Sequence, residues 1–392
     1  MLKNVSLLLF SLLVCSALQA QTEEDILIGT KHRLYSDILG EDREYWISLP
    51  ESYSAEGADY KRYPVLIVLD GPTHFRHITG TVNYMSAGYN GNRRIPEMII
   101  VAISNVNRRR DFTPDKVITV RENDSGGGER FLSFLEQELI PELDESYRTA
   151  PYRILFGHSL GGLLATHTYL KKETLFHAFI AVDPSFGTWD AETMDEKLAQ
   201  TDHSVFKRYL YIATANWGKR NIRNRDRHVR LYEALNSKCA GPFPAKLEYF
   251  PDENHGSVPT PAFYKGVSAV FAGYGPYYRD INNTEQLIQH YQALSDRLSW
   301  DIPPPEALVN RVAYYLLRSR DEKEQQKSLD FFILNTTNYP GSYQAFERLG
   351  AAYLTLGQAE KAVRSYQKSL VLYPNNQSAR TKLEQLKAGQ KH

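Results

Sequence analysis

A serine in a glycine-rich segment is the strongest sign of chemistry in the sequence. Ser159 stands in Gly157-His-Ser-Leu-Gly161, which matches the pattern G-x-S-x-G. Composition alone would produce this pattern in about one chain in eight of this length, so its context decides its value. An apolar, strand-like run (153–156) precedes it and a helical pattern (160–170) follows it. A strand-to-helix corner lifts a serine hydroxyl above the sheet edge, so we predict Ser159 as a nucleophile.

A nucleophilic serine needs a base that accepts its proton. Seven histidines follow Ser159 in the chain. His255 follows the last apolar run (247–250), on a loop expected at the carboxyl end of the sheet, where the base of this arrangement belongs. His228 lies in an arginine-rich stretch and is predicted to be solvated. We therefore predict His255 as the base.

The carboxylate that would orient His255 is left open by the sequence. It should follow the strand-like run 209–214, but residues 215–219 contain no acid. Asp226 is the first acid downstream and ranks first, with helix capping as its alternative role. Glu253, close to the histidine, ranks second, and a Ser–His pair without an acid ranks third.

A developing oxyanion requires two backbone N–H donors. One is expected from Leu160, the residue after the nucleophile. The other is expected from the loop that follows the apolar run 64–69. Since Pro72 in that loop has no N–H, the second donor is predicted to be Gly71 or Thr73.

Two features bear on a small-molecule ester substrate. Arg108 begins a run of three arginines, and six further basic residues lie between positions 219 and 230. A cationic rim would attract anionic or catecholate-like esters, whereas the alternative is a solvated face with ordinary ion pairs. Trp217 would wall an aryl-binding pocket or belong to the core. Arg108 and Trp217 are thus the candidate substrate-binding residues.

These residues need a sheet that brings strand ends together. Short apolar runs alternate with helical patterns through residues 21–280, which predicts an α/β fold, of the α/β-hydrolase type, with a mostly parallel sheet and helices on both faces. In such sheets, sites form beyond the carboxyl ends of the strands. The predicted strands are 45–49, 64–69, 98–104, 153–156, 179–183, 209–214 and 246–250. The predicted helices are 129–144, 160–170, 226–236 and 261–271.

The last part of the chain has a different character. Residues 281–308 are predicted to be a linker with one helix, ended by three consecutive prolines at 303–305. Residues 309–392 follow a tetratricopeptide-like pattern, since Pro340 and Pro374 are one repeat length apart. We predict a degenerate repeat (309–342), a good repeat and a capping helix. A groove for a protein partner and a purely stabilising appendage both remain open.

The first twenty residues resemble a secretory signal peptide, with Lys3 at the start, an apolar run and small residues up to Ala20. We therefore expect a periplasmic or secreted protein. Lipid anchoring at Cys15 is disfavoured because Val14 fits poorly before the cysteine.

Several classes of protein are disfavoured by composition. Removal of residues 1–20 would leave Cys239 as the single cysteine, so neither an internal disulfide nor a cysteine metal cluster is expected. A formal net charge of zero argues against a nucleic-acid-binding protein. No segment after the leader is long and apolar enough to span a membrane. No metal or other cofactor is expected.

On these residues the chain resembles the putative-esterase family of α/β-hydrolases, which holds enterochelin-type siderophore esterases, esterase D and the mycolyltransferases. The resemblance covers about 28–274, and the segments that carry it are Leu69-Asp-Gly71, 99–114, the serine turn, Val182-Asp-Pro-Ser185 and 253–259. It implies Ser159 as nucleophile and His255 as base. The chain departs from the family at Pro72 and at Trp217, where close relatives often have Glu. These departures leave the second oxyanion donor and the acid open.

Three functions follow from this sequence. The first is an exported serine carboxylic ester hydrolase that works through an acyl-enzyme, on siderophore-type or carbohydrate-linked esters. The second is an acyltransferase that uses the same serine and histidine. The third is a repeat-based binding protein with a vestigial hydrolase domain, against which the intact serine turn and His255 loop argue.

Overall fold

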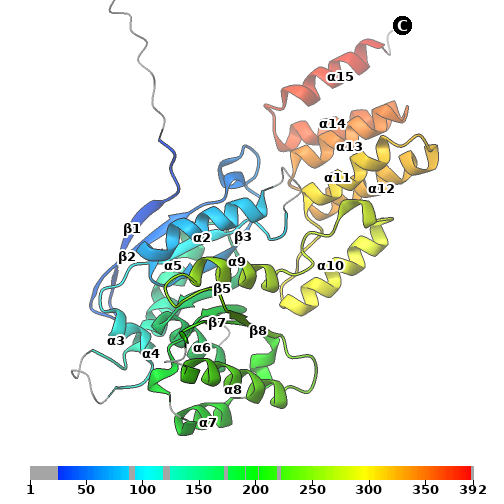
Figure 1. Ribbon diagram of the computed structural model, residues 1–392. Coiled ribbons are helices and arrows are strands. Elements are labelled where there is room, and N and C mark those ends of the chain that lie inside the picture. Colours follow the sequence, from blue (N-terminus) through cyan, green and yellow to red (C-terminus); the bar gives the residue numbers. More distant parts are fainter. Residues whose placement is uncertain are drawn as a thin grey trace, which may run out of the picture.

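The computed structural model describes residues 25–87, 93–117, 124–171, 175–189, 191–201, 203–218 and 222–389. An eight-stranded sheet forms its centre, with helices on both faces and a helical extension at one side (Figure 1). The expected leader with Cys15 lies outside the described residues, as do Lys219 and Arg220 of the expected basic rim.

The strand order in the sheet is β1-β2-β4-β3-β5-β6-β7-β8. The first two pairs in this order, β1 with β2 and β2 with β4, are antiparallel. Every later pair, from β4 with β3 to β7 with β8, is parallel. The carboxyl ends of the parallel strands therefore meet at one edge of the sheet, where sites of this fold form. The strands are β1 (Thr30–Ser36), β2 (Glu41–Ser48), β3 (Tyr63–Val68), β4 (Ile99–Ile103), β5 (Thr149–His158), β6 (Ala178–Val182), β7 (Tyr209–Ala215) and β8 (Ala245–Phe250).

Two helical layers enclose this sheet. One layer holds α2 (Gly71–Ser86) and α9 (Pro259–Val270), which lie on the same side in Figure 1. The other holds α4 (Gly128–Phe134), η3 (Leu135–Leu139), α5 (Ile140–Ser146), α6 (Leu160–Leu170), α7 (Ala191–Gln200) and α8 (Ile222–Lys238). Short helical turns complete the connections: η1 (Glu51–Ser54), α3 (Arg108–Phe112), η4 (Phe186–Thr188), η5 (His203–Lys207) and η7 (Tyr278–Asp280).

The central strands are buried on both faces. Leu66 and Val68 of β3 face the core shared with α2 and α9, while Val65 and Ile67 face the core shared with α4, α6 and α8. Successive side chains of a strand point to opposite faces, so a strand covered on both sides is apolar almost throughout. This explains the near-continuous apolar runs in the sequence and confirms the predicted fold class.

The elements that pattern reasoning missed are those with a weak apolar signal. Strand β1 is an edge strand with mostly polar side chains, and most of its residues are not buried. Helix α2 begins with the sequence GPT, which is typical of a turn. Its helical conformation depends on packing of Phe75, Ile78 and Val82 against the sheet. Helix α6, which follows Ser159, has the bounds predicted from the sequence.

The C-terminal extension is all-helical and consists of two helical hairpins and a final helix. Its members are α11 (Glu306–Leu317), α12 (Glu322–Asn338), α13 (Tyr343–Thr355), α14 (Ala359–Leu372) and α15 (Gln377–Gly389). Residues 281–308, predicted as a linker, contain α10 (Thr284–Leu298), whose Leu287 and Tyr291 are buried. The core shared by α2 and α9 continues through these side chains to Leu349 and Ala352 of α13. The extension is therefore joined to the sheet by a continuous apolar core.

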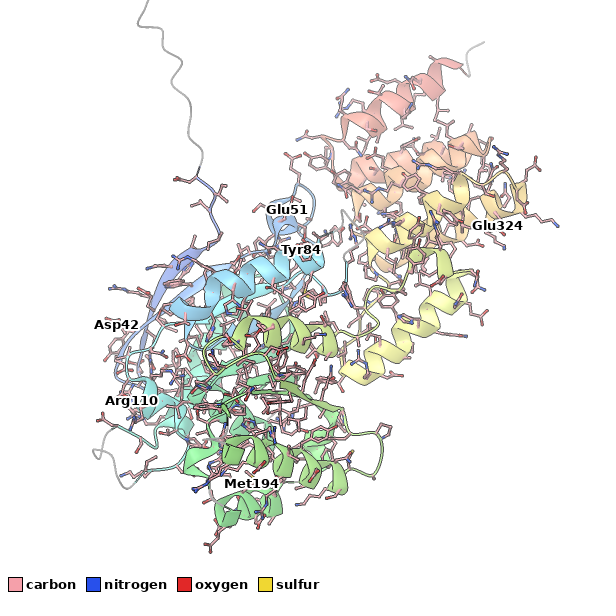
Figure 2. All side chains as sticks on the ribbon, in the orientation of Figure 1. Asp42, Glu51, Tyr84, Arg110, Met194 and Glu324 are labelled. Carbon is pink, nitrogen blue, oxygen red and sulfur yellow. The ribbon has the colours of Figure 1, made fainter. Side chains whose placement is uncertain are left out.

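A polar contact reinforces this junction. The Glu306 carboxylate accepts hydrogen bonds from the Tyr60 hydroxyl (2.7 Å) and the Ser342 hydroxyl (3.0 Å), and it lies 3.4 Å from Arg348. Figure 2 shows side chains filling the sheet-containing part, where Met194 lies on α7, and the extension, where Glu324 lies on α12. Among the described helices, none has the length and apolar character needed to cross a bilayer. The described residues also contain no group of three or more His, Cys, Asp or Glu side chains arranged to hold a metal ion.

Candidate active site

Ser159 occupies a sharp corner between β5 and α6. Its backbone has φ 60° and ψ −119°, a conformation that non-glycine residues rarely adopt. The Ser159 N–H donates to the Val182 carbonyl (3.0 Å), which fastens the corner to the neighbouring strand. A Cβ atom on Gly157 would overlap the Gly161 carbonyl, so the corner requires glycine there. The strand–corner–helix arrangement predicted for Ser159 is present.

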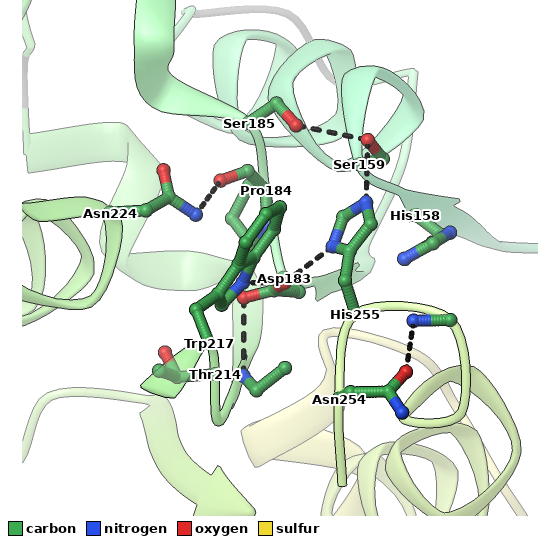
Figure 3. Close-up of polar contacts among 12 residues, drawn as sticks. His158, Ser159, Asp183, Pro184, Ser185, Thr214, Trp217, Asn224, Asn254 and His255 are labelled. Carbon is green, nitrogen blue, oxygen red and sulfur yellow. Dashed lines mark hydrogen bonds and ion pairs between the residues drawn. The ribbon is translucent and has the colours of Figure 1, made fainter. Parts of the chain in front are cut away.

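His255 lies on the loop after β8 and faces Ser159. Its Nε2 is 3.1 Å from the Ser159 Oγ, within hydrogen-bonding distance (Figure 3). The loop is shaped by Asn254, whose side-chain oxygen accepts from the N–H groups of Gly256 (2.9 Å) and Ser257 (3.1 Å). The structure thus brings together the serine and the histidine that the sequence singled out.

The carboxylate beside His255 is Asp183, which follows β6. Its Oδ2 lies 2.6 Å from the His255 Nδ1. An ionised carboxylate can only accept, so the His255 Nδ1–H donates to Asp183 and Nε2 is left to accept from the Ser159 hydroxyl. Among the described residues, the arrangement Ser159–His255–Asp183 forms a continuous hydrogen-bonded chain.

The two acids favoured by the sequence lie elsewhere. Asp226 is exposed on α8 and lines a groove of about 530 Å³ together with Arg225, Glu233 and Tyr249. Glu253 precedes the His255 loop, and its backbone carbonyl accepts from the Asn216 N–H (2.7 Å). Among the described residues, neither of these two side chains is hydrogen-bonded to His255. The expectation that Asp226 or Glu253 orients His255 is therefore corrected to Asp183 by the geometry.

The sequence contains a signal that could have identified Asp183 as the acid. The segment Val182-Asp-Pro-Ser185 contributed to the family resemblance and follows a predicted strand. The acid was expected after the next strand along the chain, and Trp217 stands there instead. Since β6 lies beside β5 in the sheet, its carboxyl end is adjacent to Ser159. Strand adjacency, which the sequence does not encode directly, would have identified this acid.

Three donors hold the Asp183 carboxylate, whose side chain is fully buried. The Ala215 N–H donates to Oδ1 (3.1 Å), and the Trp217 indole N–H and His255 donate to Oδ2. Burial by itself raises the pKa of Asp183, but these hydrogen bonds outweigh it and hold the pKa below its ordinary value. Asp183 is therefore ionised at neutral pH. Its φ of 42° is another strained value for a residue with a side chain.

Two aromatic rings lie against the His255 imidazole. The Trp217 ring centroid is 4.5 Å from that of His255, and the His158 centroid is 4.4 Å away (Figure 3). Trp217 was a candidate substrate-binding residue, and the structure places it against Asp183 and His255, with 38% of its surface exposed. Burial, followed by the proximity of His255, lowers the pKa of His158 to about 4, so this ring is neutral near pH 7.

Helix α8 supports the segment that carries Asp183. The Pro184 carbonyl accepts from the Asn224 side-chain amide (3.1 Å) and from the His228 Nε2–H (2.7 Å). The Asn224 side-chain oxygen accepts from the Phe186 N–H (3.2 Å). The prediction that His228 is solvated is wrong, because the residue is fully buried and its Nδ1 is 2.7 Å from the Thr214 hydroxyl. A hydrogen-bonded histidine in an arginine-rich helix has no distinctive sequence signal.

The predicted oxyanion donors lie at the starts of two helices. Leu160 is the first residue of α6 and Gly71 is the first residue of α2. The Thr73 N–H is occupied, since it donates to the Asp70 carbonyl (3.0 Å). Within the described residues, no hydrogen-bond partner is found for the N–H groups of Leu160 and Gly71. Of the two residues considered for the second donor, Gly71 is therefore the better placed.

Arg108, the other candidate substrate-binding residue, is engaged within the protein. Its guanidinium donates to both Asp70 carboxylate oxygens (2.6 and 2.9 Å) and to the His158 carbonyl (3.2 Å). Arg110 is likewise paired with Glu41 and Asp111. The contacts of Arg108 link the segment before α2 to the serine corner. Because Arg108 and Arg110 are paired with carboxylates, they contribute less positive charge to a cationic rim than the sequence pattern predicted.

Comparisons with known proteins agree with this architecture. Residues 36–218 match the family model described as "Putative esterase". An IroE-like serine hydrolase from Shewanella oneidensis superposes with a TM-score of 0.68 at 27% identity, over 79% of this chain and 99% of that one. The BES protein from Bacillus cereus superposes with a TM-score of 0.51 at 25% identity, over 63% of this chain and 96% of that one.

Ferri-bacillibactin esterase BesA from Bacillus subtilis (strain 168) is 30% identical over 194 residues, which are 45% of this chain and 64% of BesA. The chain spans less than two thirds of the length of the curated relatives that it matches. The family match covers β2 to β7 and includes Ser159 and Asp183. The fold, the site geometry and these likenesses support an enterochelin-esterase-like family of α/β-hydrolases, and residues 36–218 are similar to the family described as putative esterases.

Proposed function

We propose that the protein is a serine carboxylic ester hydrolase that works through an acyl-enzyme, with Ser159 as nucleophile, His255 as base and Asp183 as the acid that orients the base. The observation that carries this proposal is the hydrogen-bonded chain from Ser159 Oγ to His255 (3.1 Å) and from His255 to the buried Asp183 (2.6 Å). A nucleophile, a base and an orienting group at these distances are what activation of a serine requires.

In the first half-reaction, Ser159 Oγ attacks the ester carbonyl carbon and its proton passes to His255 Nε2. The N–H groups of Leu160 and Gly71 hold the negative charge on the former carbonyl oxygen. Collapse of this intermediate breaks the ester C–O bond, and the imidazolium of His255 returns the proton to the leaving alcohol. The ionised Asp183 stabilises that imidazolium and keeps it in the required tautomer.

In the second half-reaction, water attacks the acyl group on Ser159. His255 takes one proton from the water, the same two N–H groups hold the oxyanion, and collapse releases the carboxylic acid while the proton returns to Ser159. An alcohol in place of water would give acyl transfer with the same residues. The expected acyltransferase alternative is therefore distinguished by its products rather than by its site.

As the substrate class we propose siderophore-type esters. The support is the name of a curated relative, ferri-bacillibactin esterase, which is 30% identical over 194 residues. Carbohydrate-linked, feruloyl and simple acyl esters are the comparison classes.

The test is the Ser159→Ala variant, assayed with p-nitrophenyl acetate and with one ester of each class. We expect kcat/KM to fall by about 10³-fold or more, because the variant lacks the hydroxyl that is hydrogen-bonded to His255. Ser133→Ala, a surface serine whose hydroxyl bonds to the Glu129 carbonyl of α4, is the matched control and should retain full activity. Full activity of the Ser159 variant would reject the proposal.

Two further outcomes are distinguished in the same assay. Absence of turnover on every class, together with no labelling of Ser159 by a fluorophosphonate, would favour the vestigial-domain alternative. Transfer of the acyl group to added methanol in preference to water would favour an acyltransferase.

A further inference from the structure

We infer that Trp217 is a positioning residue of the active site, which fixes Asp183 and His255 together and does not act as a wall for the substrate. This inference rests on the proposed function, since it assigns a role within the same reaction.

The indole N–H and the imidazole share one carboxylate oxygen. Asp183 Oδ2 lies 2.6 Å from Trp217 Nε1 and 2.6 Å from His255 Nδ1, while the Ala215 N–H occupies Oδ1 at 3.1 Å. The carboxylate therefore cannot rotate toward His255 or away from it without breaking its bond to Trp217. Removing the indole N–H frees this rotation and leaves the buried Oδ2 with fewer donors.

The indole face also supports the histidine ring. Trp217 and His158 lie on the imidazole at centroid distances of 4.5 and 4.4 Å, with interplanar angles of 44° and 39°. The face of an indole ring attracts a cation. His255 becomes cationic only after it has taken the Ser159 proton, so Trp217 interacts more favourably with the state that follows proton transfer. The His158 ring is neutral there and adds no repulsion.

The backbone around Trp217 connects the acid and the base loops. Asn216 donates from its N–H to the Glu253 carbonyl (2.7 Å) and from its side-chain amide to the Pro251 carbonyl (2.7 Å). The segment after β7 is thus bonded to the segment that leads to His255. Displacement of Trp217 would move both partners of the Asp183–His255 bond. A substrate wall would not require these connections.

The decisive experiment is a double-mutant cycle with Trp217→Phe and Asp183→Asn. Phenylalanine keeps an aromatic face and removes the N–H. We expect Trp217→Phe to lower kcat by about 10-fold, the loss of one hydrogen bond to a charged group, with KM for p-nitrophenyl acetate changed by less than about 2-fold. In the Asp183→Asn background, the same change should lower kcat by less than about 2-fold, because the carboxylate through which Trp217 acts is gone.

The matched control is Trp46→Phe. Trp46 also donates its indole N–H to a carboxylate, that of Glu44 at 2.8 Å, on β2. Its replacement should leave kcat and KM unchanged. An equal effect of Trp217→Phe in both Asp183 backgrounds, or an effect confined to KM, would overturn the inference in favour of a substrate wall.

A spectroscopic measurement tests the contact without changing Trp217. The chain contains four tryptophans, so indole-¹⁵N labelling gives four N–H resonances that single Trp→Phe variants assign. We expect the Trp217 resonance to shift upfield in Asp183→Asn, while the Trp189 resonance, whose N–H lies 3.1 Å from Asp115, stays in place. An unmoved Trp217 resonance would contradict the shared carboxylate.

Failure of this inference is separable from failure of the proposed function. If Ser159→Ala abolishes turnover while Trp217→Phe behaves like Trp46→Phe, the catalytic assignment stands and the role of Trp217 falls. If Ser159→Ala remains active, the proposed function itself fails.

Discussion

At the scale of single residues, the site depends on groups held in conformations and protonation states that they would not adopt alone. Ser159 and Asp183 both have positive φ values without being glycine. Such strained positions persist where surrounding contacts fix them, as the Val182 carbonyl does for Ser159 and three donors do for Asp183. The lowered pKa of Asp183 keeps it charged, and a charged acceptor selects the His255 tautomer that can accept from Ser159.

The identity of the acid gives the first prediction at this scale. Asp183→Asn should lower kcat by about 10²–10⁴-fold, because the amide can donate to His255 and favour the wrong tautomer. Asp226→Asn is the matched control, since the same change occurs on the exposed face of α8, and it should change kcat by less than about 2-fold. Steady-state kinetics with p-nitrophenyl acetate checks both. A larger loss in Asp226→Asn than in Asp183→Asn would restore the assignment made from the sequence.

At the scale of elements, the site is built where four segments meet. Strand β5 ends at the serine corner, β6 ends at the acid, the segment after β7 brings Trp217, and the loop after β8 brings His255. The starts of α2 and α6 add the two N–H groups proposed for the oxyanion. Helix α8 braces the acid segment through Asn224 and His228. Each segment is bonded to a neighbour by backbone hydrogen bonds, so the sheet holds the side chains of the site in fixed positions.

The close approach of α2 to the sheet gives a prediction at this scale. A Cβ atom on Gly71 would lie 2.8–2.9 Å from the backbone of Ala102 and Ile103 in β4. Gly71→Ala should therefore displace the start of α2, lower the free energy of unfolding by about 1–3 kcal/mol and reduce kcat. Gly80→Ala in the same helix meets no atom within 4 Å and should stabilise by up to about 1 kcal/mol. Urea unfolding and kcat measurements compare the two, and equal stability of both variants would contradict the steric argument.

At the scale of the whole molecule, the helical extension and the sheet are parts of one folded unit. Side chains of α10 and α13 belong to the same core as those of α2 and α9, and Tyr60 and Glu306 bond across the junction. Helix α15 instead packs in a small separate cluster with α14, through Ala379 and Leu383. The extension thus stabilises the catalytic part whether or not its helices also bind a partner.

Truncations should show this difference. Removal of residues 281–392 would expose the apolar surface that α10 covers. The deleted side chains Leu287, Tyr291, Leu294 and Leu298 are buried, and burial of each contributes about 1.5–3 kcal/mol to stability. We expect the shortened protein to be insoluble or to unfold at much lower temperature. Removal of residues 377–392 should lower Tm by only a few degrees and leave kcat unchanged. A soluble, fully active protein that lacks residues 281–392 and keeps the original Tm would show that the shared core is dispensable.

Buried histidines give a prediction for stability against pH. Burial lowers the pKa of His74 to about 3 and of His158 and His177 to about 4. In the unfolded chain these groups have the ordinary value of about 6.5, so below that pH the unfolded state binds more protons than the native state. The free energy of unfolding should therefore lose nothing to these histidines above about pH 6.5. It should decrease as the pH falls from there toward 4.

The measurement is the urea midpoint of unfolding between pH 7.5 and 5, a range in which most carboxylates do not titrate. His74→Gln should reduce the slope of the midpoint against pH. A midpoint that stays constant over this range would show that these histidines titrate in the native state as they do in the unfolded chain.

The sequence by itself determined the features that depend on local patterns. Glycine spacing around Ser159, an apolar run before it and a helical pattern after it identify the corner, because its geometry is set within about ten residues. His255 was found because its loop follows the last strand. The alternation of apolar runs with helical patterns predicted an α/β sheet, since strands buried on both faces must be apolar throughout.

The tertiary structure decided what depends on which strand ends are neighbours. Asp183, and not Asp226 or Glu253, lies at His255 because β6 adjoins β5 and turns its carboxyl end toward the serine. Trp217 and Arg108 proved to be bonded to Asp183 and Asp70, since a side chain's partner is set by folding and not by its type. Contacts between residues far apart in the chain have no local pattern, so only the folded arrangement of strands and helices determines them.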